Sequence, residues 1–187
     1  MTNLERIQRK QLIQTAEGYL ELALVYDDCW PLDESLRFEL AQKAIDQLSQ
    51  ISSPQGHKPY ILFLKGQAYR TMKDYPRAIN YLEQSSRLDL DNIHTMLALA
   101  WCYKRDDRIQ DAIQATEIAL RVQRDSPIVN YNLACYWALT GNARKAVIYL
   151  SHAFELDPVY RDRVSDESDF DPIRDDEEFL AIATVIV

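Results

Sequence analysis

The strongest constraint in this sequence is a repeat of 34 residues. Three units align without a gap, at 59–92, 93–126 and 127–160. The eighth and twentieth positions of every unit hold small residues: Gly66, Ala100, Ala134, Ala78, Ala112 and Ala146. A sequence with this period builds one small unit per repeat, and neighbouring units must stack because no single unit can bury its apolar face alone.

Small and large side chains alternate in a way that predicts two antiparallel helices per unit. Small residues let two backbones approach closely, and the aromatic residue at position eleven fills the space beside them. Polar turns are expected at 104–108 and 139–143, where Gly141 is free to adopt the left-handed conformation that often ends a helix. The register therefore predicts about nine helices and no sheet.

This pattern resembles the tetratricopeptide repeat, a helix-turn-helix unit. Residues 141–158, GNARKAVIYLSHAFELDP, are similar to the second half of its consensus. The resemblance implies an all-α fold, a right-handed superhelix of helix pairs with a capping helix at its C-terminal end. It covers residues 59–160 and says much less about activity, because fold does not determine function.

A degenerate helix pair is expected at 1–58. Ala16 and Tyr19 take the eighth and eleventh positions, but Ala44 falls sixteen residues later than the regular spacing requires, which indicates an insertion. Asp33 is expected to cap the helix that follows. Trp30, inside the insertion, either packs on the first helix or anchors a partner from an exposed loop, and packing is favoured because large aromatic residues are mostly buried.

The last segment, 161–187, is predicted to cap the final repeat. Residues 159–187 hold nine acidic and three basic side chains, a net charge of −6 out of −8 for the whole chain. DFDPIRDDEEF resembles the ending of small bacterial tetratricopeptide proteins, which implies that Phe170 and Ile173 are buried and that Asp175 opens a short helix. Side chains expected to cover the last repeat are Phe170, Ile173, Phe179, Leu180 and Ile182.

Composition excludes several classes of protein. The chain has no basic stripe for nucleic acid or an anionic membrane, and no apolar run of the roughly 18 residues that a membrane span needs, so a cytoplasmic protein is expected. Its three cysteines lack metal-ligand spacing and are expected to be reduced, buried thiols. A calcium loop built on Asp166, Asp169 and Asp171 lacks the glycine and closing glutamate of an EF-hand. Neither a metal nor a cofactor is predicted.

Catalytic patterns are also scarce. The three histidines, His57, His94 and His152, occur without the context of a known catalytic arrangement, and four glycines provide no phosphate-binding loop. The chain is therefore predicted to be a non-enzyme.

The candidate binding surface lies on the first helix of each repeat, which lines a concave groove in tetratricopeptide arrays. Positions two, five, nine and twelve share one helical face, and position six also points inward. The groove residues predicted in this way are Tyr60, Phe63, Gln67, Arg70, His94, Leu97, Trp101, Lys104, Ile128, Tyr131, Asn132 and Cys135. Only Asn132 resembles a residue of the family's clamp for peptide carboxylates, so an apolar or amphipathic segment of another protein is the expected ligand.

Three functions remain open at this point. The favoured one is an adaptor or scaffold that binds another protein or peptide in the groove. The alternatives are a self-assembling or enzyme-associated structural subunit and a small acidic chaperone of the secretion type. The groove could also be filled by the chain's own N-terminal helix or by residues 179–187, FLAIATVIV.

Overall fold

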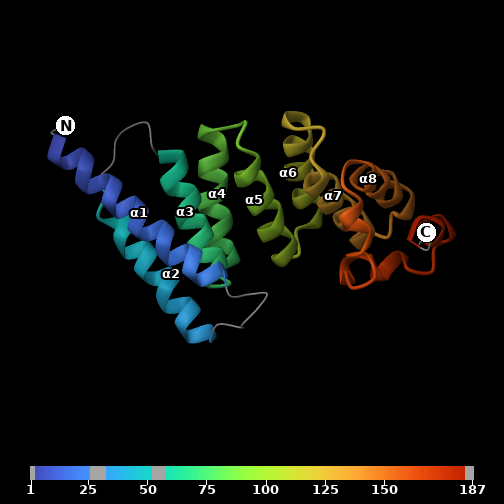
Figure 1. Ribbon diagram of the computed structural model, residues 1–187, viewed down its shortest axis with the longest axis horizontal. Coiled ribbons are helices and arrows are strands. Elements are labelled where there is room, and N and C mark those ends of the chain that lie inside the picture. The colour runs from blue at the N-terminus through green and yellow to red at the C-terminus, as the bar shows by residue number, and fades with distance from the viewer. Residues whose placement is uncertain (1–2, 26–32, 52–57, 184–187) are drawn as a thin grey trace. The chain divides into compact units, whose positions relative to one another are not determined.

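The computed structural model describes residues 3–25, 33–51 and 58–183, and within these ranges all regular structure is helical (Figure 1). The α-helices are α1 Asn3–Val25, α2 Glu34–Ser49, α3 Lys58–Thr71, α4 Tyr75–Leu88, α5 Ile93–Arg105, α6 Ile109–Val122, α7 Pro127–Leu139, α8 Ala143–Leu156 and α9 Glu177–Ala183. Two 3-10 helices, η1 Pro158–Arg161 and η2 Ser168–Ile173, precede α9. The predicted all-helical class is confirmed. Cys29, Trp30 and His57 lie outside the described residues.

The chain divides into two compact units, Met1–Leu90 and Asp91–Val187. The first unit holds α1 to α4 and the second holds α5 to α9 with both 3-10 helices. Within each unit, consecutive helices pack against each other in pairs: α1 with α2, α3 with α4, α5 with α6, and α7 with α8. The division into 1–58, 59–160 and 161–187 that the sequence suggests stays a prediction.

The small residues lie where the paired helices touch, as the repeat pattern predicts. Ala78, Ala112 and Ala146 have no exposed surface. Gly66 of α3 faces Leu82 of α4 so closely that a Cβ at this position would lie 2.6 Å from the leucine Cγ. The small residues therefore mark the positions at which the two helices of a pair pack closely.

The turn inside each of the three repeats uses the same backbone conformation. Its fifteenth residue has a positive φ in every case: 61° at Lys73, 59° at Asp107 and 73° at Gly141. The left-handed conformation expected for Gly141 is confirmed, and two residues with side chains adopt it as well. The side chains of Asp74 and Asn142, one residue later, cap α4 and α8.

In the first unit, α1 and α2 pack together around the residues that the degenerate repeat predicts. Ala16 and Ala44 are fully buried, in a cluster that also contains Leu48 of α2 and Leu64 of α3. Asp33 caps α2, as expected, and its carboxylate accepts a hydrogen bond from the backbone N–H of Ser35 at 3.4 Å. None of the described helices in either unit combines the length and the apolar character needed to cross a membrane.

In the second unit, the chain after α8 returns to cover the last repeat. η2 packs on α7 and α9 packs on α8, and Phe170, Ile173 and Phe179 are buried as predicted. Two details of the prediction are wrong. Asp176 opens α9 in place of Asp175, because its carboxylate oxygen accepts bonds from the N–H groups of the first turn. Leu180 is 43% exposed, since it follows Phe179 directly and points about 100° away around the helix.

Candidate functional site

The predicted groove residues of the first unit lie on α3. Tyr60 is 45% exposed, and its ring stacks on Phe63 with the ring centroids 6.2 Å apart. The Tyr60 hydroxyl donates to the carboxylate of Glu17 on α1. Burial, followed by this hydrogen bond and the charge of Glu17, raises the pKa of Tyr60 to about 12. Gln67 and Arg70 are half-buried one and two turns further along the helix.

On α5 the predicted residues form a partly exposed strip. His94 is exposed, and Leu97, Trp101 and Lys104 are half-buried. Leu97 packs against a buried cluster of Met96, Ala119 and Val129, and Ile128 of α7 packs against the same cluster. The guanidinium group of Arg105 lies over the Trp101 ring, 5.0 Å from its centroid. We call His94, Leu97, Trp101 and Ile128 the α5 strip.

On α7 the structure buries two of the four predicted residues. Tyr131 is 4% exposed and Cys135 is 3% exposed, whereas Ile128 and Asn132 are half-buried. The Tyr131 ring lies 4.9 Å from that of Tyr160 and meets the ring of Phe170 edge-on at 5.8 Å. Residues 164–173, which we call the C-terminal segment, therefore cover this face of α7.

A buried ion pair fastens the C-terminal segment to α5. The Lys104 ammonium group lies 2.6 Å from the Asp169 carboxylate, and the two side chains are only 18% and 11% exposed. Removing one partner of such a pair leaves the other charge buried and unpaired, which is strongly destabilising. Sequence reasoning missed Asp169 because 65 residues separate it from Lys104 and nothing distinguishes it from the other acids of this segment.

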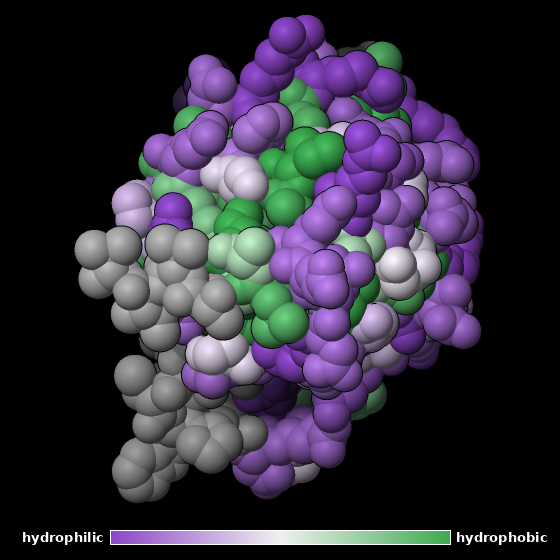
Figure 2. All heavy atoms as spheres, turned by 90° about the vertical axis from the view of Figure 1, so that its right-hand side faces the viewer, coloured by the Kyte–Doolittle hydropathy of each residue, from purple (hydrophilic) through white to green (hydrophobic). Residues whose placement is uncertain are grey.

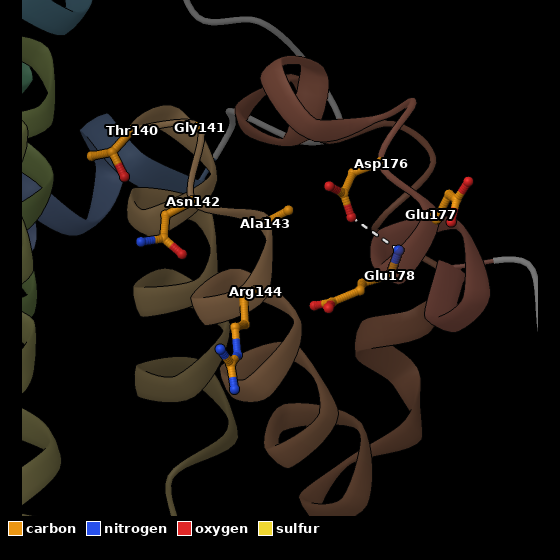
Figure 3. Close-up of a pocket in the computed structure, with 8 residues that line it drawn as sticks. All are labelled: Thr140, Gly141, Asn142, Ala143, Arg144, Asp176, Glu177 and Glu178. Carbon is orange, nitrogen blue, oxygen red and sulfur yellow. Dashed lines mark hydrogen bonds between the residues drawn. The ribbon is translucent and has the colours of Figure 1, made fainter.

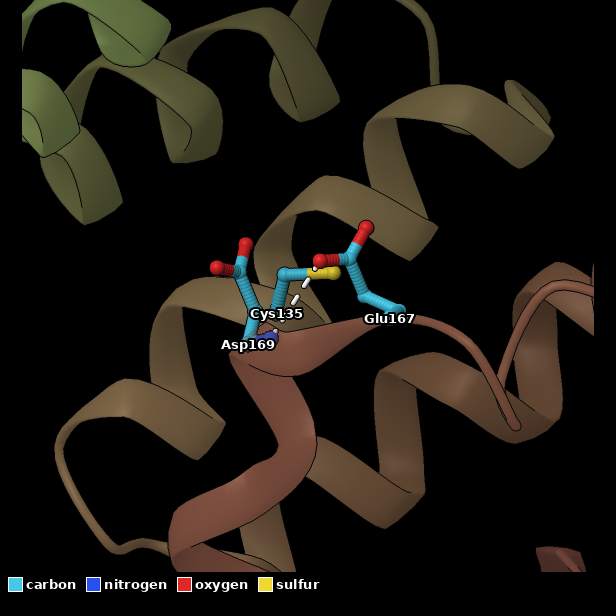
Figure 4. A group of neighbouring side chains, drawn as sticks. All are labelled: Cys135, Glu167 and Asp169. Atoms are coloured by element: carbon cyan, nitrogen blue, oxygen red, sulfur yellow. Dashed lines mark hydrogen bonds between the residues drawn. The ribbon is translucent and has the colours of Figure 1, made fainter.

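The same segment brings two carboxylates next to a thiol (Figure 4). One ligand atom each of Cys135, Glu167 and Asp169 lies within 4.8 Å of the other two. The Glu167 carboxylate accepts a hydrogen bond from the backbone N–H of Asp169 at 3.2 Å. Burial, with a further contribution from the two carboxylates, raises the pKa of Cys135 well above its usual value, so the thiol is neutral at pH 7.

The three acids considered for a calcium loop each contact a different side chain. Asp169 binds Lys104, Asp171 lies 2.6 Å from Arg174, and Asp166 accepts a hydrogen bond from Ser165. The described contacts thus give these carboxylates separate structural roles.

An open hollow of about 660 Å³ lies beside the turn between α7 and α8 (Figure 3). Thr140, Gly141, Asn142, Ala143 and Arg144 line one side, and Asp176, Glu177 and Glu178 line the other. The start of α8 and Arg144 are positive and the start of α9 carries three acids, so the two walls oppose each other in charge. A second hollow, of about 460 Å³, contains His152 with Tyr149 and Leu156.

The end of the second unit also exposes apolar side chains. Figure 2 shows them gathered near the middle of this face, within a polar surround. The elements at this end leave Ile148 of α8 48% exposed, Val159 of η1 56% exposed and Leu180 of α9 43% exposed. The cap therefore covers the last repeat and presents a smaller apolar surface of its own.

Comparison with known proteins supports the interpretation of the repeats. The tetratricopeptide repeat family model matches residues 59–92, the first of the three 34-residue units. No match is found among curated proteins.

Solved structures match a larger part of the chain. A MamA fragment from Desulfovibrio magneticus RS-1 is 15% identical, with a TM-score of 0.62, over 81% of this chain and 76% of that one. The first tetratricopeptide domain of Spaghetti (RPAP3), bound to the HSP90 peptide SRMEEVD, is 17% identical with a TM-score of 0.55, over 69% of this chain and 93% of that one. At these identities the likeness concerns the fold. Residues 59–92 match the tetratricopeptide repeat, and the chain shares the all-helical fold of these solved repeat structures.

Proposed function

We propose that this protein is a non-catalytic scaffold that binds an apolar or amphipathic segment of another protein on the α5 strip. The observation that carries the proposal is the partial exposure of Leu97 and Trp101 beside the exposed His94. Tetratricopeptide repeats are interaction modules, and the Spaghetti domain was solved with a bound peptide. A partly exposed tryptophan is the type of side chain that carries much of the binding energy in protein interfaces.

The ion pair at the end of the strip argues against a ligand held by its carboxylate. Lys104 is one of the predicted groove residues, and its ammonium group already pairs with the Asp169 carboxylate at 2.6 Å. Tyr131 and Cys135 are covered by the C-terminal segment, so they offer no surface to a partner in this conformation. The remaining open part of the strip is aliphatic and aromatic, which suits an apolar helix or extended segment.

The proposal is tested by substituting the strip and measuring capture of a partner. Wild-type protein, Trp101→Ala and the control Val122→Ala are immobilised and exposed to lysate, and the recovered protein is then titrated in purified form. Val122 is 44% exposed on α6 and lies outside the strip. Trp101→Ala is expected to weaken binding by ~2 kcal/mol, roughly thirtyfold, and Val122→Ala to leave it unchanged. A partner that binds both variants equally would contradict the proposal.

The apolar end of the second unit supports a second candidate, self-association. Ile148, Val159 and Leu180 are all more than 40% exposed, and Figure 2 shows apolar side chains within a polar surround on this face. Exposed apolar patches with a polar rim often mark protein interfaces. Light scattering on the purified chain tests this alternative: a dimer that dissociates on Leu180→Glu supports it, and a monomer at all concentrations removes it.

A further inference from the structure

The cluster of Cys135, Glu167 and Asp169 has the geometry of a metal site. Its three donor atoms come from two elements, α7 and the residues just before and in η2, and each lies within 4.8 Å of the others. Zn²⁺ binds sulfur at about 2.3 Å and carboxylate oxygen at about 2.0 to 2.2 Å, so small side-chain rotations would bring all three donors to bonding distance. Cys135 and Asp169 are 3% and 8% exposed, which limits competition from water.

A buried hydroxyl group supplies an independent observation. The hydroxyl of Tyr131 is buried and finds no hydrogen-bond partner among the residues that the structure describes. Tyr131 lies one helical turn before Cys135 and therefore on the same face of α7. A water molecule bound to a cation here would give the hydroxyl the partner that it lacks.

The charges of the cluster point in the same direction. The carboxylates of Asp169 and Glu167 carry two negative charges, and Lys104 contacts one oxygen of Asp169, Oδ2, at 2.6 Å. When a divalent cation binds, the S–H bond breaks, a sulfur–metal bond forms and the proton leaves to solvent.

We propose that Cys135, Glu167 and Asp169 bind a divalent cation, with Zn²⁺ as the best match and water as the fourth ligand. Zinc accepts both thiolate and carboxylate ligands, whereas Ca²⁺ and Mg²⁺ take oxygen ligands almost without exception. Lys104 keeps its bond to Asp169 Oδ2, and the metal uses the other oxygen. The ion would fasten the C-terminal segment to α7.

Cobalt substitution tests the sulfur ligand directly. Co²⁺ is titrated into the full chain, and absorption from thiolate-to-cobalt charge transfer is recorded before and after Zn²⁺ is added. The wild type is expected to show this absorption and to lose it on zinc addition. Cys135→Ser removes the ligand and should abolish the band. Cys102→Ser is the matched control, because Cys102 is a buried cysteine of α5 outside the cluster, and this variant should keep the band.

A carboxylate variant protects the test against a folding defect in Cys135→Ser. Glu167→Gln keeps the size of the side chain and an oxygen that can accept the Asp169 N–H, but it should weaken Zn²⁺ binding at least ~10-fold. The matched control is Asp166→Asn, which removes an adjacent negative charge outside the cluster. Zn²⁺ at about 100 times its dissociation constant should raise the melting temperature of the wild type and of Asp166→Asn by roughly 5 to 10 °C.

Two outcomes would overturn the proposal. Wild-type protein that shows no charge-transfer band and no zinc-dependent rise in melting temperature would show that the cluster does not bind a divalent cation. A band that survives in Cys135→Ser would place the metal at another thiol.

Discussion

Helices α3 and α7 occupy the same place in their repeats, yet their equivalent side chains have different surroundings. Position five is Phe63 on α3, which is half-buried, and Tyr131 on α7, which is 4% exposed. Position nine is the half-buried Gln67 on α3 and the buried Cys135 on α7. The repeat sets the direction in which these side chains point. A segment outside the repeats, residues 164–173, decides that those of α7 are covered.

The largest effect is expected from removing residues 164–187, which include η2 and α9, both packed on the last repeat. A chain truncated after Arg163 loses three side chains that are at most 3% exposed, Phe170, Ile173 and Phe179. It also loses the contact of Tyr131 with Phe170 and the ion pair of Lys104 with Asp169. Burial of such apolar side chains contributes about 1.5 to 3 kcal/mol each before entropy is subtracted. We expect the melting temperature to fall by at least ~10 °C and the protein to aggregate. Calorimetry and light scattering measure both, and a truncated chain that melts like the full chain would show that the segment is not a cap.

A single substitution in η2 should have the next largest effect. Phe170 is fully buried, with its ring 5.8 Å from Tyr131 and 5.4 Å from Phe179. Phe170→Ala should lower the free energy of unfolding by about 3 to 5 kcal/mol, measured by urea denaturation. The control Leu180→Ala, at a 43% exposed position, should change it by less than ~0.5 kcal/mol. Equal losses of stability in the two variants would mean that the Phe170 ring is not buried as the structure shows.

Two ion pairs differ in exposure: the pair in the second unit is largely buried, and the pair in the first unit is exposed. Lys104 and Asp169 are 18% and 11% exposed, whereas Lys73 and Glu34 of the first unit are 60% and 77% exposed. Lys104→Met should cost about 2 kcal/mol because it strands a buried carboxylate. Lys73→Met should leave the denaturation midpoint unchanged. If adding Asp169→Asn to Lys104→Met recovers no stability, the stranded charge is not the cause.

Turn residues test a feature that the repeat alone should control. Asp107 and Gly141 share position fifteen, with φ of 59° and 73°. Asp107→Gly should stabilise the protein by about 0.5 to 1 kcal/mol, and Gly141→Ala should destabilise it by a similar amount, because a side chain is strained in this conformation. Urea midpoints measure both. Effects of the same sign would show that the surroundings of each turn matter more than its repeat position.

The smallest expected effect concerns Tyr60 of α3, which is 45% exposed. The pKa of Tyr60 is raised to about 12, first by burial and then by Glu17, above the unperturbed value of 10.0. The unfolded chain therefore loses this proton first, so the contribution of Tyr60 to stability is complete below pH 10 and disappears between about pH 10 and 12. NMR titration of ring-labelled tyrosine should show the high midpoint, and Glu17→Gln should lower it. A Tyr60 midpoint near 10 in the wild type would contradict the bond to Glu17.

Local features of the repeats were predictable from the sequence by itself. Small residues at fixed positions identified the helix contacts, Gly141 identified a turn, and Asp33 identified a helix start. These features depend on residues a few positions apart, or on the 34-residue repeat that aligning the three units reveals. Their physical causes are backbone geometry, capping and close helix packing, and each acts within one repeat. Phe170, Ile173 and Phe179 were also identified as cap residues, since an end repeat must be covered.

Only the tertiary structure decided which groove residues are open and which are covered. No local pattern indicates that Asp169 meets Lys104 or that Glu167 lies beside Cys135, because each pair is joined through a return of the chain over α7. The helix start at Asp176 and the exposure of Leu180 likewise depended on how α9 docks on α8. The sequence determined which side chains share a helical face. Long-range packing determined what each face contacts, because burial depends on residues that are distant along the chain.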